Sequence, residues 1–175
     1  FFRKFSDIYI GFMRCIPQVV LLMIMFYVVL GKTSLSGTAV AVVAFSMCFG
    51  AYTSVIFTST MKGIDRGQRE AALSMGFTPY RTFMNFILPQ VVQRALPVYR
   101  NEFISLVKAT SIVGYITVFD LTRAGDIIRS RTFEAFFPLL IVTVIYFIII
   151  WLLILLLKYA QLKSQPVVHK YSKKH

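Results

Sequence analysis

The most distinctive spacing of polar residues lies in a stretch between two long apolar segments. Glu70-Ala71-Ala72 is followed by Gly76, and later by Leu88 and Pro89. The arginines around this stretch are Arg66, Arg69, Arg81 and Arg94. The stretch is polar and helix-forming, and it is the longest polar loop of a chain rich in apolar segments. We therefore expect this stretch to dock onto a partner.

Residues that could bind a nucleotide or catalyse a reaction lack the spacing that such sites require. Gly31-Lys32-Thr33 matches the end of a phosphate-binding loop, but that motif needs Gly five residues before Gly31, where Phe26 stands. The two histidines, His169 and His175, lie in a basic tail. A Ser/His/Asp or Cys/His arrangement is therefore not credible. We expect no catalytic residue, no metal and no cofactor in this chain.

Composition indicates a helical membrane protein. The chain has 175 residues, of which 57% are hydrophobic and 15% charged, whereas soluble domains carry about 25% charge. Residues 138–157 form an apolar run without the alternation of a β-barrel strand. The net charge of +12 lies mainly at the ends of apolar runs, which disfavours nucleic-acid binding. Cys15 and Cys48 are isolated, so they form neither a disulfide framework nor a metal site.

Four membrane-spanning helices are predicted within a transmembrane domain at residues 1–160, followed by a basic tail at 161–175. The predicted spans are residues 10–30, 39–60, 96–117 and 135–157. A short loop (31–37), a long polar loop (61–94) and a charged loop (118–134) connect them. Most of the 19 Lys and Arg residues fall on the side of the polar loop and the tail. The positive-inside rule therefore places the polar loop and the C-terminus in the cytoplasm.

The polar loop itself has helix boundaries. Asp65 with Gln68 three residues later resembles a capping box, which predicts a helix over residues 66–75. Gly76 fits the left-handed position that ends it. Thr78 and Pro79 suit the N-cap and the first position of a second helix. Pro89 is expected to interrupt or bend the chain at the end of that helix.

These residues resemble the EAA signature of the permease subunits of ABC importers. In that signature Glu-Ala-Ala is followed by Gly after three residues, then by Ile and Leu-Pro. Glu70, both alanines, Gly76, Leu88 and Pro89 match, while Phe86 occupies the Ile position. The resemblance implies a type I importer fold, in which residues 66–76 form a coupling helix docked on a cytoplasmic ATPase. Its coupling residues would be Arg66, Gly67, Arg69, Glu70, Ala71, Ala72, Gly76, Leu88 and Pro89.

Similarity to the polar amino-acid branch of these permeases extends over nearly the whole chain. It includes Arg14-Cys15-Ile16-Pro17, Gly50-Ala51-Tyr52, Leu96-Pro97, Asn101-Glu102-Phe103, Lys108 and Thr110-Ser111. That branch has a further helix upstream, and this chain begins without Met, so we expect it to be part of a longer or fused polypeptide. The branch usually has Glu and Arg-Gly where Val55 and Thr58-Ser59 stand here.

The resemblance implies a multi-pass protein of a prokaryotic cytoplasmic membrane that transports polar amino acids. Its partners would be two ATPase subunits that bind ATP and Mg²⁺, a second permease copy or homologue, an extracytoplasmic solute-binding protein or fused binding domain, and membrane lipid.

The predicted third span carries polar residues at membrane depth. Asn101, Ser105 and Lys108 share one helical face, and Glu102 and Ser111 flank it. Ionisable groups inside a membrane are costly and usually face the bundle interior or a cavity. This face either lines the pathway or a subunit interface, or Lys108 snorkels and pairs with Glu102.

Two other functions stay open at this stage. A membrane scaffold or sensor could dock an ATPase without carrying solute, and the changes at Val55 and Thr58 are compatible with it. An importer for another class of small solute would share the same cytoplasmic loop. Solute-stimulated ATPase activity with uptake into vesicles separates the scaffold from an importer, whereas only the resemblance of the membrane helices favours amino acids over another solute.

Overall fold

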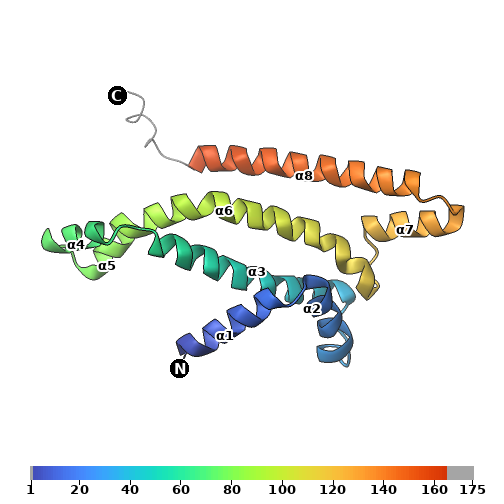
Figure 1. The fold of residues 1–175 in the computed structure, drawn as a ribbon, viewed down its shortest axis with the longest axis horizontal. Helices are drawn as coiled ribbons and strands as arrows, with labels where there is room; N and C mark the ends of the chain where they lie inside the picture. The colour runs from blue at the N-terminus through green and yellow to red at the C-terminus, as the bar shows by residue number, and fades with distance from the viewer. Residues whose placement is uncertain (1, 165–175) are drawn as a thin grey trace. The chain divides into compact units, whose positions relative to one another are not determined.

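A computed structural model describes residues 2–164 of the chain, with side chains described for residues 4–161. Every regular element in this part is helical (Figure 1), so the all-α prediction is confirmed. Both histidines and the predicted tail lie outside the described residues, except for residues 161–164, which are helical. In chain order the helices are α1 (Phe2–Cys15), α2 (Gln18–Ile24), α3 (Gly37–Lys62), α4 (Arg66–Ser74), α5 (Pro79–Thr82), α6 (Leu88–Ala109), α7 (Leu121–Thr132) and α8 (Phe136–Ser164).

The helices contribute to two compact units, residues 1–55 with 102–150 and residues 56–101 with 151–175. The core of the first unit is built from α2 and the inner face of α3. Leu22 and Ile116 are fully buried there, and Cys48 is only 2% exposed. The Tyr9 hydroxyl donates a 2.9 Å hydrogen bond to the backbone carbonyl of Met47, which fixes α1 to α3.

The predicted first span is broken rather than continuous. α1 ends at Cys15, and the helix formed by α2 and a π-helical segment (Met25–Val29) turns by 107° from it. Pro17 has extended backbone angles (φ −58°, ψ 134°). Because proline lacks an N–H and disfavours helical geometry in the residue before it, Ile16 and Pro17 end the first helix.

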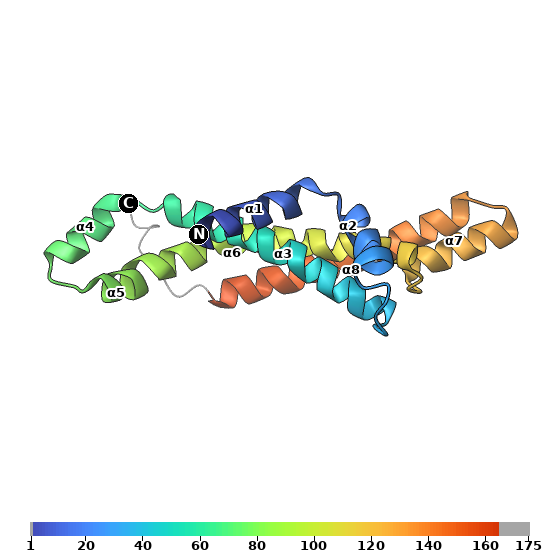
Figure 2. The same ribbon diagram turned by 90° about the horizontal axis from the view of Figure 1, so that it is seen from below.

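The predicted charged loop at 118–134 contains the helix α7, and both views show α7 beside the first turns of α8 (Figures 1 and 2). Asp120 caps α7, since its carboxylate accepts hydrogen bonds from the backbone N–H groups of Arg123 (2.9 Å) and Thr122 (3.3 Å). Gly125 lies so close to α8 that an added Cβ would be 2.6 Å from Val142 Cγ2.

The predicted third span begins earlier than expected. The second helix of the polar loop does not stop at Pro89: α5 continues through a π-helical segment (Phe83–Ile87) into α6. Pro89 cannot donate a backbone hydrogen bond, and the wider π turn directly before it accommodates this loss without a break. Beyond Ala109 the chain continues as a 3₁₀ helix over Thr110–Ile116.

Four membrane spans are compatible with this fold. By length and composition, Gly37–Lys62 and Phe136–Gln161 could each cross a bilayer alone. Two bent pairs could supply two more spans, namely Lys4–Cys15 with Gln18–Val29, and Pro79–Ile116 with Leu121–Thr132. None of the tested window of α8 is buried within the chain, so this helix leaves most of its apolar surface for lipid or for other subunits.

Candidate coupling site in the 61–94 loop

The first helix of the loop begins at a defined N-cap. The Asp65 side chain accepts a 2.9 Å hydrogen bond from the backbone N–H of Gly67, which satisfies one of the free donors at the helix start. The reciprocal half of the predicted capping box is replaced, because the Gln68 side-chain oxygen accepts a 2.6 Å hydrogen bond from Gln90 Nε2 instead. The predicted helix start at residue 66 is confirmed.

Gly76 ends this helix as predicted. Its φ is +86°, which is the left-handed region that glycine adopts without steric cost. The N–H of Phe77 bonds to the carbonyl of Ala72 (3.2 Å), and the N–H of Gly76 bonds to the carbonyl of Leu73 (3.0 Å). This pair of hydrogen bonds is the Schellman motif, so α4 ends sharply at a fixed position.

The second helix starts at Thr78 and Pro79, also as predicted. The Thr78 hydroxyl accepts a 3.3 Å hydrogen bond from the N–H of Arg81, and Pro79 occupies the first helical position. α4 and α5 form the two arms of a hairpin (Figure 2). Leu88 and Pro89, the last residues of the predicted motif, lie at the start of α6 rather than in a loop.

Three contacts hold the hairpin, the residues after α3 and the start of α6 together. Ile64, Ile87 and Val91 form a small buried core. Arg94 donates a 3.1 Å hydrogen bond to the carbonyl of Gly63, beyond the C-terminal end of α3, where a positive charge is favourable. The Phe77 and Phe86 rings meet edge to face, with centroids 5.1 Å apart. The loop is therefore a fixed structure and not a linker.

The two faces of α4 have different roles in this structure. Ala72 is only 4% exposed, and α4 contacts α5 and the π-helical segment, so the small Ala72 side chain allows packing inside the loop. Gly67, Glu70, Ala71 and Ser74 are exposed and recur at spacings of three and four residues. This outward face of small residues has Glu70 as its acidic group.

Charged groups on α4 are free to meet a partner. Arg66, Arg69 and Glu70 are all exposed. Within residues 4–161, the ion pair formed is Arg129 with Asp126, so none of the three is paired. Sequence reasoning placed all three at the ATPase contact, and the structure brings them together on one helix.

The polar residues of α6 and of the 3₁₀ segment after it remain candidates for a pathway or an interface. Asn101, Ser105 and Lys108 are exposed, whereas Glu102 and Ser111 are partly buried. The suggested pairing of Lys108 with Glu102 is not formed among the described side chains. The described residues also contain no group of three or more His, Cys, Asp or Glu that could hold a metal.

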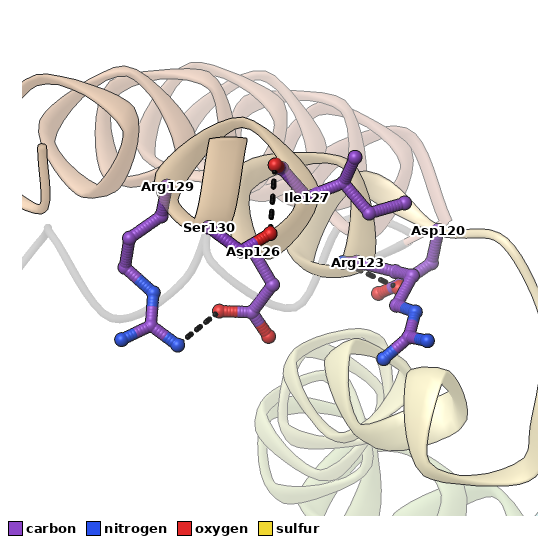
Figure 3. Close-up of polar contacts among 6 residues, drawn as sticks. All are labelled: Asp120, Arg123, Asp126, Ile127, Arg129 and Ser130. Carbon is purple, nitrogen blue, oxygen red and sulfur yellow. Dashed lines mark hydrogen bonds and ion pairs between the residues drawn. The ribbon is translucent and has the colours of Figure 1, made fainter. Parts of the chain in front are cut away.

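A charged face on α7 was missed by sequence reasoning. Asp126 and Arg129 form a half-exposed ion pair at 3.2 Å, and they lie on the same side as Arg123 and Ser130 (Figure 3). The signal was present in the sequence: Asp120 is a good N-cap, and Leu121, Gly125 and Ile128 recur at helical spacing. The high charge of this segment concealed its amphipathic pattern.

Comparisons with known proteins identify the family. Residues 1–166 match the family described as "Binding-protein-dependent transport system inner membrane component". The chain is 35% identical over 153 residues to the L-cystine transport system permease protein TcyB of Bacillus subtilis, covering 86% of this chain and 65% of that protein. It is 29% identical over 164 residues to a putative glutamine transport system permease protein GlnP of Rickettsia felis, covering 92% of this chain and 75% of that protein.

Two solved structures have a similar fold. A chain from "Crystal structure of an amino acid ABC transporter with histidines" gives a TM-score of 0.80 at 33% identity, over 90% of this chain and 74% of that one. The MetNI methionine ABC transporter in inward-facing conformations gives a TM-score of 0.70 at 22% identity, over 94% of this chain and 76% of that one. The chain therefore belongs to the family of inner-membrane components of binding-protein-dependent transport systems, as a permease subunit of an ABC importer.

Proposed function

We propose that this chain forms part of the membrane pathway of an ATP-driven importer for polar amino acids, and that α4 is its coupling helix. The substrate class is supported by relatives named for cystine and glutamine transport and by the structural likeness to an amino acid ABC transporter. The assembly would contain two cytoplasmic ATPase subunits, a second permease copy or homologue, and a solute-binding protein outside. ATP and Mg²⁺ would be bound by the ATPases.

The observation that carries this proposal is the rigid mounting of α4. Its start is capped by Asp65 and its end by the turn at Gly76, while the Gln68–Gln90 hydrogen bond fixes it to α6. Its outward face, with Glu70 and small residues, is exposed. A helix held in this way transmits a movement of the ATPase to the membrane helices instead of bending.

Coupling then works by alternating access. When the two ATPase subunits bind ATP and close on each other, they move α4. The motion passes to α3 and α6, because the cytoplasmic ends of these helices belong to the same compact unit as α4. The exposed polar side chains Ser105 and Lys108 on α6 supply hydrogen-bonding groups for a polar solute, since polar groups at membrane depth face a pathway or another subunit rather than lipid.

Uptake by the reconstituted complex tests the proposal. The full-length permease, its ATPase and its solute-binding protein are placed in liposomes loaded with ATP, and uptake of labelled glutamine and cystine is compared with uptake of a labelled sugar. We expect amino-acid uptake that requires ATP. Uptake of the sugar alone would contradict the substrate class. ATPase binding without uptake of any solute would favour the scaffold function.

A further inference from the structure

A pocket of about 330 Å³ lies on the inner side of α4, between the end of α3 and the second helix of the loop. Its floor is apolar and includes Ile64, Phe83 and Ile87, while Arg66 and Arg69 stand at its rim. This volume is at the lower end of the range for small-molecule sites, about 300–1,000 Å³. It therefore suits one or two inserted side chains.

The wall of the pocket contains a polar group without a partner. Thr82 is 1% exposed, and its hydroxyl makes no hydrogen bond. A helical threonine normally donates to the carbonyl four residues earlier. Three other threonines of this chain do so, with distances of 2.7 to 2.9 Å: Thr60, Thr132 and Thr143. Because a buried unsatisfied hydroxyl is costly, a partner that enters the pocket and accepts a hydrogen bond from Thr82 after a small rotamer change would relieve this cost.

The charge of the rim restricts the chemistry of that partner. Arg66 and Arg69 have no ion-pair partner among the described side chains, and the neighbouring Asp65 carboxylate is engaged in capping α4. The rim is thus positive, and the floor is apolar. A partner that complements both the positive rim and the apolar floor presents an apolar side chain next to a carboxylate.

We propose that an apolar side chain of the ATPase, next to an acidic residue, inserts into this pocket. The inference rests on the proposed docking of α4, because two exposed arginines of that helix, Arg66 and Arg69, line the pocket. The pocket walls come from the end of α3, from α4 and from the helix that continues into α6. An inserted side chain would therefore allow the ATPase to pull on these helices, whereas contact with the outward face alone could only push them.

Site-specific photo-crosslinking tests this insertion in the complex of full-length permease with its purified ATPase in nanodiscs. A benzoylphenylalanine replaces Phe83, which lines the pocket and is 38% exposed, or Met84, which does not line it and is 39% exposed. A third probe at Ala71 reports the outward face of α4. We expect Phe83 and Ala71 to label the ATPase, with the Phe83 product on a peptide that contains an acidic residue, and Met84 not to label it.

The outcomes separate the two proposals. Labelling of the ATPase from Ala71 but not from Phe83 would contradict insertion into the pocket, and so would equal labelling from Phe83 and Met84. Either result would still agree with docking of the ATPase on α4. Absence of labelling from all three positions in a complex that binds its ATPase would overturn the docking of α4 as well.

Substitutions that preserve the shape of the pocket provide a second measurement. Thr82→Val removes the hydroxyl, so we expect ATPase affinity to fall by about fivefold while the thermal stability of the free permease is unchanged or higher. Arg69→Gln should lower affinity by about tenfold, and Arg81→Gln, an exposed arginine that does not line the pocket, should leave it unchanged. Lower stability of the Thr82→Val permease with unchanged affinity would show a structural role and contradict the insertion.

Discussion

Substitution of Gly76 tests how sharply the end of α4 is defined. The residue has a φ of +86°, and a Cβ added there would have no heavy atom within 4 Å. The cost of Gly76→Ala therefore comes from the backbone alone, about 1–2 kcal/mol for a left-handed residue with a side chain. This energy corresponds to an increase of about 5- to 30-fold in the opening of the last turn.

Amide hydrogen exchange measures that opening. The N–H groups of Met75, Gly76 and Phe77 bond to carbonyls within α4, so their exchange should accelerate by this factor in Gly76→Ala, and less in Gly76→Asn because asparagine tolerates the left-handed region. Gly11→Ala is the control: a methyl group there also has no heavy atom within 4 Å, but the residue lies inside α1. Unchanged exchange at residues 75–77 in Gly76→Ala would refute the reasoning.

Three further substitutions test the packing of the loop and of α7. Asp65→Ala should remove the cap on Gly67 and destabilise α4 by about 1 kcal/mol, as measured by hydrogen exchange, with Asn in its place restoring most of the loss. Gly125→Ala would place a Cβ 2.6 Å from Val142 Cγ2 and should lower the thermal unfolding midpoint, whereas adding Val142→Ala should recover it; strictly additive losses would argue against this contact. Ala72→Leu should destabilise the loop by about 1–3 kcal/mol through overpacking, while Ala71→Leu should preserve the unfolding midpoint and weaken ATPase binding; equal midpoints for the two variants would contradict the assignment of the faces.

Local signals were read correctly from the sequence. Asp65, Gly76 and Thr78 act through hydrogen bonds or backbone angles within a few residues of their own positions, so neighbouring residues suffice to predict them. The same local chemistry explains why the first residue of α4 was predicted correctly.

Features that depend on distant residues could not be read in this way. The 107° turn after Cys15 requires packing of α2 against the distant 3₁₀ segment Thr110–Ile116 in addition to the effect of Pro17. Burial of Ala72 but not Ala71 depends on where α5 lies. Residues 121–132 were taken as a charged loop because their apolar positions are few and become meaningful only when α8 packs near Gly125.

The central claim is that energy enters the chain through the outward face of α4. The direct test is ATP-dependent amino-acid uptake by the reconstituted complex with Glu70→Lys, compared with Glu134→Lys, which makes the same charge change at an exposed position outside the loop. We predict that Glu70→Lys abolishes uptake and weakens ATPase binding, whereas Glu134→Lys retains ATPase binding. Full uptake and normal ATPase binding by Glu70→Lys would contradict the account.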